Sequence, residues 1–123
     1  MSKVKVRKAV PNDADEIANV LLDFYNIEDH KEAKKIFIDE QKKEFHYLIA
    51  VEDDQVLGLV AWITHGLPKH GLFELDRICI MTKARGKGIG KKLVNELIDD
   101  ANYWYRNRNC LLYTSDAADE SVS

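Results

Sequence analysis

The alternation of apolar and polar residues predicts four strands. Over residues 3–10, Val4 and Val6 alternate with charged residues, which is typical of a half-buried strand. Apolar stretches at residues 46–51 and 55–64 flank Asp53 and Asp54, a pattern that indicates a hairpin. A fourth strand is expected over residues 72–81. Gly58, inside the third strand, predicts either a bulge or a close approach of another backbone.

Apolar residues at helical spacing predict three helices. The first follows residues 11–13, where Pro11 ends the strand and Asn12 is a candidate N-cap. A second helix, over residues 29–44, has a thin apolar face and should lie on the surface. The third covers the sheet with one apolar face, namely Ile89, Leu93, Val94, Leu97, Ile98 and Ala101. The predicted order is strand, two helices, three strands and a helix.

Length and composition restrict the class of protein. The chain has 123 residues, 46% of them hydrophobic and 32% charged, which fits one globular domain. No apolar run approaches the roughly 18 residues of a membrane span. The first ten residues lack the apolar core of a secretion signal. We therefore expect a cytoplasmic protein with no membrane partner.

Charge and metal-binding residue types exclude further classes. The two cysteines, Cys79 and Cys110, and the four scattered histidines have no metal-ligand spacing, so no metal cofactor is expected. The net charge of −3 argues against bulk nucleic-acid binding. A DNA-binding or antitoxin-linked role is disfavoured because no basic helix is present.

A glycine-rich loop between the fourth strand and the third helix carries the strongest functional signal. It reads Arg85-Gly86-Lys87-Gly88-Ile89-Gly90. Glycines allow close approach of the backbone, and the start of a helix offers free N–H groups and a positive dipole end, so the expected ligand is a phosphate group. Lys91 stands where a dinucleotide-binding motif or a Walker loop would need glycine.

The spacing Arg85-x-x-Gly88-x-Gly90, after a strand that ends Ile78-Cys79-Ile80, resembles the coenzyme A pyrophosphate loop of the GNAT superfamily of N-acetyltransferases. The resemblance implies an α+β, three-layer fold, the N-terminal part of the GNAT acyl-CoA N-acyltransferase fold, with a mixed, mostly antiparallel sheet flanked by helices. It also implies acetyl-CoA as co-substrate and a primary amine as acceptor. The implied cofactor-binding residues are Ile78, Cys79, Ile80, Arg85, Gly86, Lys87, Gly88, Ile89, Gly90 and Lys91.

The resemblance also suggests catalytic residues. Glu74 and Asp76 lie on the fourth strand, and alternation would put both on one face, where either could be the general base for the amine. Glu74 is the first choice, and pairing with a neighbour such as Lys69 is the alternative. Cys79 is expected to be a packing residue, because a thiolate inside an apolar strand is costly.

Other roles stay open at this level. Tyr103, Tyr105 and Tyr113 do not match the family's general acid. Acidic residues near the second helix could attract a cationic amine, but a solvated helix end explains them equally well. The alternatives to an enzyme are a non-catalytic coenzyme A-binding module and a glycine-rich connection that binds nothing.

The end of the chain departs from the family pattern. Residues 110–114 could form a strand, whereas residues 115–123 have no amphipathic pattern. The stretch CLLYTSDAADE resembles a translated sequencing-library adapter, with a native short C-terminus as the alternative. We expect a partial acetyltransferase domain over residues 1–109 and a non-native or disordered tail over 110–123. An exposed edge on the fourth strand would make a homodimer a candidate assembly.

Overall fold

The structure is a computed structural model that describes residues 3–25, 29–64 and 72–107. Within these residues the order of helices and strands is the predicted one, and the short 3-10 turns η1 and η3 are added. The elements are β1 (Lys5–Lys8), η1 (Pro11–Asp13), α1 (Ala14–Tyr25), α2 (His30–Lys42), β2 (His46–Glu52), β3 (Gln55–Thr64), β4 (Phe73–Ile80), η3 (Thr82–Ala84) and α3 (Ile89–Asn107). The predicted loop at 65–71 with Lys69, the strand at 110–114 and the tail at 115–123 lie outside the described residues.

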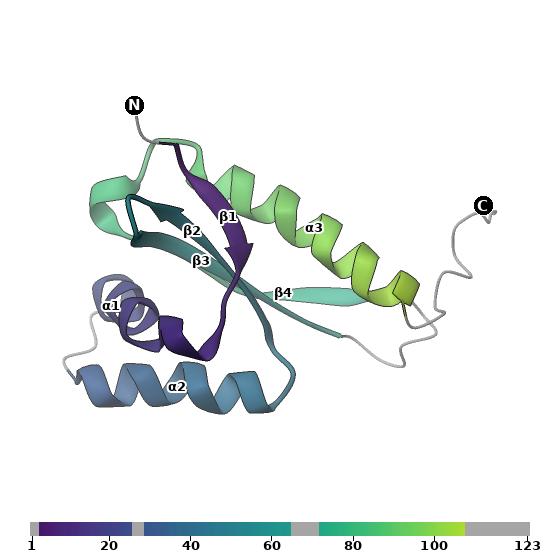
Figure 1. Ribbon diagram of the computed structural model, residues 1–123, viewed down its shortest axis with the longest axis horizontal. Helices are drawn as coiled ribbons and strands as arrows, with labels where there is room; N and C mark the ends of the chain where they lie inside the picture. Colours follow the sequence, from purple (N-terminus) through teal and green to yellow (C-terminus); the bar gives the residue numbers. More distant parts are fainter. Residues whose placement is uncertain (1–2, 26–28, 65–71, 108–123) are drawn as a thin grey trace.

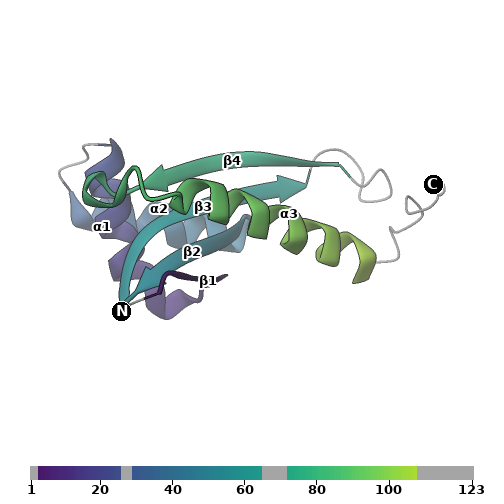
Figure 2. The same cartoon turned by 90° about the horizontal axis from the view of Figure 1, so that it is seen from above.

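The four strands among the described residues form one sheet in the order β1-β2-β3-β4, and every described pair is antiparallel. Helices α1 and α2 cover one face and α3 covers the other, which gives three layers (Figure 1). The view from above shows α3 running along the sheet on the side away from α1 and α2 (Figure 2). The α+β three-layer fold predicted from the sequence is therefore confirmed.

Each face of the sheet has its own core. On the α1/α2 face the largest buried side chains are Ile17, Leu21, Phe37, Tyr47, Ile49 and Leu59. On the α3 face they include Val60, Trp62, Leu93 and Leu97. The predicted apolar face of α3 is narrower than expected, because Ile98 is 42% exposed and Tyr105 is buried instead.

Gly58 combines both predicted features. The pairing of β2 with β3 shifts between Ala50 and Val51, so β3 carries one extra residue, Leu57, beside the glycine. A Cβ atom on Gly58 would lie 2.8 Å from Cδ1 of Ile80 and 3.0 Å from the backbone oxygen of Cys79. Glycine therefore lets β3 approach the end of β4 closely.

The start of the first helix differs from the prediction in its capping residue. The Asp13 carboxylate accepts the Val10 N–H at 2.8 Å, and the Asp13 N–H donates to the Val10 oxygen at 2.9 Å. Arg7 donates to the same carboxylate at 2.8 Å. Asn12, the expected cap, lies inside the 3-10 turn. The N-cap of α2 is Asp29, where the sequence prediction began that helix.

Candidate functional site

The glycine loop follows η3 and leads into α3. Gly86 and Gly88 have φ angles of 80° and 76°, in the left-handed region that side chains rarely adopt. A Cβ atom on either residue would have no neighbour within 4 Å. The loop therefore needs glycine for its backbone path, and the space above the two glycines is open to a ligand.

The loop and the first turn of α3 present unpaired N–H groups. In the part of the chain that the structure describes, the amides of residues 86–91 donate to no backbone oxygen. The first bonded amide is that of Lys92, which donates to the Gly88 oxygen at 3.2 Å. The Arg85 amide, expected to contact a pyrophosphate, instead donates to the Thr82 oxygen at 3.4 Å. The available donors thus begin at Gly86.

The charge around the loop is positive throughout. No acidic residue occurs between Asp76 and Glu96, whereas the loop and its flanks carry Lys83, Arg85, Lys87, Lys91 and Lys92. Lys87 and Lys91 are exposed. Because the N-terminus of a 19-residue helix lies at the same place, charge and dipole both favour an anion there.

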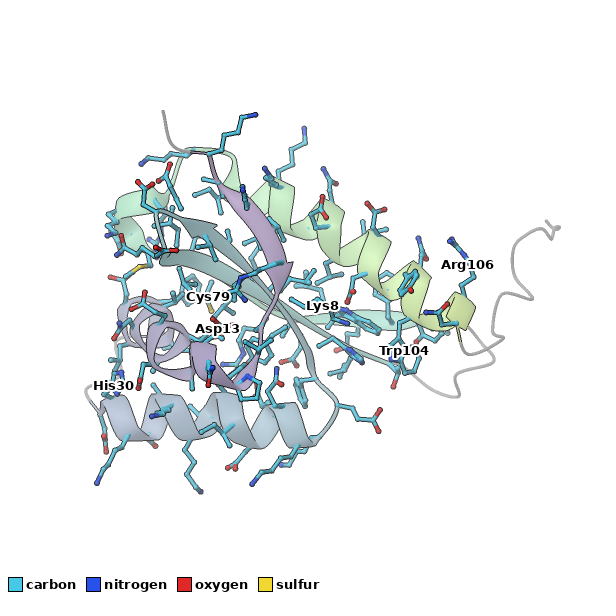
Figure 3. The ribbon with its side chains drawn as sticks, in the orientation of Figure 1. Lys8, Asp13, His30, Cys79, Trp104 and Arg106 are labelled. Atoms are coloured by element: carbon cyan, nitrogen blue, oxygen red, sulfur yellow. The ribbon has the colours of Figure 1, made fainter. Side chains whose placement is uncertain are left out.

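The end of β4 packs directly under this helix start. A Cβ atom on Gly90 would lie 3.7 Å from Cδ1 of Ile78 and 4.0 Å from Cγ1 of Ile80, which is ordinary contact. Cys79 points to the opposite face, toward α1, and is fully buried (Figure 3). Burial raises the pKa of its thiol, which is the behaviour expected of a packing residue.

The two candidate bases lie beside a β-bulge that the sequence did not predict. Glu74 is paired with Ile63, and Arg77 is paired with Ala61. The register shifts between these pairs, so Asp76 is the extra residue of β4. The strict alternation used to place Glu74 and Asp76 on one face therefore does not hold along this strand.

A partly buried charged network lies next to the bulge, on the α1/α2 face. Arg77 donates from Nη2 to Oε2 of Glu40 at 2.8 Å, and their side chains are only 15% and 17% exposed. The Tyr47 hydroxyl donates to the other Glu40 oxygen. The Arg77 Nε lies 3.9 Å from Oδ2 of Asp76, and the guanidinium stands 5.5 Å above the Tyr25 ring.

Burial and charge shift the pKa values in this network. Burial, and then the hydrogen bond to Glu40, raise the pKa of Tyr47 well above its usual range. Burial also raises the pKa of Tyr25, and so does the nearby Cys79. For Arg77 burial lowers the pKa, but attraction from Tyr47 and Glu40 outweighs it and the net shift is upward. At neutral pH the tyrosines are therefore neutral and Arg77 is charged.

Sequence reasoning missed Arg77, Glu40, Tyr47 and Tyr25. Arg77 could have been singled out from the sequence, because it is a cation next to the apolar end of a predicted strand. Its partner Glu40 lies 37 residues earlier, among the many charged residues of α2, and nothing in the sequence distinguishes it from them.

Comparison with known proteins agrees with this geometry. Residues 14–120 match the model of the Acetyltransferase (GNAT) family. This match covers most of the chain, and the chain therefore belongs to that family. No curated protein sequence gives a match.

Several solved structures share the fold. A ribosomal-protein-alanine N-acetyltransferase from Brucella melitensis biovar Abortus 2308 is 29% identical, with a TM-score of 0.66 over 80% of this chain and 72% of that one. A GNAT family acetyltransferase from Brucella melitensis, solved with acetyl-CoA, is 27% identical, with a TM-score of 0.65 over 80% and 68%. The GNAT family N-acetyltransferase YhbS from Escherichia coli, solved with CoA, is 27% identical, with a TM-score of 0.67 over 85% and 59%.

The chain spans only part of its solved relatives. It covers 59% of the Escherichia coli protein and 34% of an acetyltransferase-like structure from Pyrococcus horikoshii. Among the described helices, none is both long and apolar enough to cross a membrane. No group of three or more potential metal-binding side chains occurs within residues 3–25, 29–64 and 72–107.

Proposed function

We propose that the chain is an N-acetyltransferase that moves an acetyl group from acetyl-CoA to a primary amine. The observation that carries this proposal is the loop at residues 86–91, with its two left-handed glycines and its free amides at the start of α3. The relatives solved with acetyl-CoA and CoA support the choice of donor.

On the donor side, the amides of residues 86–91 would hold the pyrophosphate, and Lys87 and Lys91 would add positive charge. Among the described strands β4 has a neighbour on one side only, so its other edge can pair with an extended ligand. Ile78 and Ile80 would bind the pantetheine amides there through their backbone, in the manner of an added strand. Acetyl-CoA itself supplies the activated thioester.

On the acceptor side, we assign Glu74 as the first candidate for the base that removes a proton from the amine. Asp76 is the second candidate, and it already has the Arg77 guanidinium 3.9 Å away. The acceptor amine is not assigned.

Substitution of Gly88 tests the donor site. Gly88→Glu should abolish binding of acetyl-CoA in calorimetric titration, because it adds bulk and negative charge where the pyrophosphate lies. Gly88→Lys carries the same backbone strain with opposite charge and should retain more affinity. Gly90→Ala should bind nearly as the parent does, since its Cβ meets Ile78 and Ile80 at ordinary distances. Unchanged affinity in Gly88→Glu would refute the donor assignment.

Turnover tests whether the chain is an enzyme. Thiol release from acetyl-CoA should be measured with a panel of amines that includes a polyamine, an aminoglycoside, a lysine peptide and a peptide with N-terminal alanine. Glu74→Gln should lower turnover and flatten the acid limb of the pH–rate profile while donor affinity is kept. The same result in Asp76→Asn alone would reverse the two roles. Binding without any thiol release would favour a non-catalytic coenzyme A-binding module.

A further inference from the structure

The last turn of α1 contacts three residues near the site: Thr82 and Arg85, which precede the glycine loop, and Arg77, which lies at the bulge of β4. The Asp23 carboxylate accepts two hydrogen bonds from Thr82, from its N–H at 2.7 Å and from its hydroxyl at 3.0 Å. The next residue, Phe24, lies under the Arg85 guanidinium at 5.6 Å from the ring centre, and Tyr25 lies under Arg77 at 5.5 Å. Successive helical residues point about 100° apart, so the chain from β4 to the loop wraps around the end of α1.

Asp23 takes the place of a missing cap. Met81, the N-cap residue of η3, has no side-chain hydrogen bond and no polar group to make one. The exposed Thr82 N–H is satisfied instead by a carboxylate 59 residues earlier in the chain. The end of a helix disfavours a negative side chain, and α1 has no basic residue in its last turn to offset it. The two hydrogen bonds from Thr82 supply that compensation.

Arg85 is held on the protein side of the loop. Its Nε donates to the Ile80 oxygen at 3.3 Å, and its guanidinium rests on Phe24. The chain that enters the loop is therefore fixed at two points, Thr82 by Asp23 and Arg85 by Phe24. Only after Arg85 do the left-handed glycines and the free amides begin.

We propose that the last turn of α1 sets the conformation of the phosphate-binding loop, and that Asp23 is the positioning residue through which it does so. The proposal rests on the function proposed above, because the loop is taken to hold the donor. Through Tyr25 and Arg77 the same turn also reaches the bulge at Asp76. Donor binding and the geometry of β4 are thus linked by three consecutive residues that need not touch the donor.

The affinity for acetyl-CoA, measured in the parent and in three variants, tests whether Asp23 positions the loop. Asp23→Ala should weaken acetyl-CoA binding about tenfold in calorimetric titration, the scale of a lost hydrogen bond to a charged group. Asp23→Asn keeps an oxygen for the Thr82 N–H and should recover part of that loss. Asp15→Ala is the control, since Asp15 lies on the same helix, has a 70% exposed side chain and pairs only with Lys34 at 3.1 Å among the described ion pairs. It should bind as the parent does.

The outcomes separate this inference from the function on which it rests. Titrations are run well below the melting temperature of each variant. If Asp23 has a merely structural role, Asp23→Ala lowers the melting temperature but leaves the affinity for acetyl-CoA unchanged. That result would overturn the inference. If the parent itself fails to bind acetyl-CoA, the proposed function is wrong. The amide NMR signals of residues 86–91, recorded without ligand, then decide whether Asp23 sets the conformation of the loop. They should shift in Asp23→Ala and not in Asp15→Ala. Unshifted loop signals in Asp23→Ala would also overturn the inference.

Discussion

The two faces of the sheet bury different kinds of side chain. Under α3 the core is aromatic: the His46 ring stacks on Trp62 at 4.0 Å, and Trp104 and Tyr105 meet edge to face at 4.9 Å. Under α1 and α2 the core includes the Arg77–Glu40 pair beside Tyr47. Cys79 and Trp104 mark these opposite sides in Figure 3.

This difference separates stability from chemistry. Aromatic side chains contribute large apolar areas and lose little conformational entropy when they are buried. A buried ion pair is a weak source of stability, because desolvation offsets most of the attraction. The pair beside the bulge therefore calls for a reason other than stability, and its position next to Asp76, the second candidate base, provides one. We therefore expect the α3 face to contribute more to stability, whereas the α1/α2 face carries the charged network beside Asp76.

The largest effect should come from the aromatic face. Trp62 is fully buried and donates from Nε1 to Asp100 at 3.0 Å. Trp62→Ala should lower the free energy of unfolding by about 3–5 kcal/mol in urea titration. Trp62→Phe should cost less, because it keeps most of the apolar contact. If Trp62→Ala cost no more than an exposed substitution, the aromatic core would not be the main source of stability.

Substitutions in the charged network should have the next largest effect on the free energy of unfolding. The size of this effect should depend on whether one member of the Arg77–Glu40 pair is left without the other. Glu40→Ala leaves the partly buried Arg77 cation without its closest partner and should cost about 3 kcal/mol of unfolding free energy. The double variant Glu40→Leu with Arg77→Met should recover most of that loss while still impairing turnover. Recovery of full turnover in the double variant would mean that the pair serves packing alone.

The smallest effect concerns alkaline pH. Because burial raises the pKa of Cys79, the folded protein keeps the thiol proton at pH values where the unfolded chain has released it. Unfolding is then favoured, so stability falls as pH rises above about 8.5, the value for a free thiol. Cys79→Ala should reduce this slope in melting experiments. Leu97→Ala, under α3, should lower stability equally at all pH values.

Much of this structure was accessible from the sequence. Strand and helix patterns are periodic, so the order of the described helices and strands was predicted correctly. The glycine loop is a local feature, and its residues lie together in the fold as they do in the chain. The contacts that shape the site are of another kind. Glu40 meets Arg77 across 37 residues and Asp23 meets Thr82 across 59, and ordinary charged residues carry no mark of a distant partner.

The bulge in β4 was missed for a related reason. Its residues read as a regular strand, and only the pairing with β3 reveals that one of them is extra. Ile98 is a simpler case. It continues the apolar spacing of α3, but spacing along a helix does not show how much of that face is covered, and the Ile98 side chain is 42% exposed.

The same bulge has a consequence for the length of the chain. Arg77 faces Ala61 and Leu75 faces Trp62, so every residue of β3 in this region already has its partner without Asp76. Deleting Asp76 would join Leu75 directly to Arg77 and leave every other pair in register. A protein one residue shorter should therefore keep the same fold with a straighter strand. The extra residue is therefore not required to build the sheet.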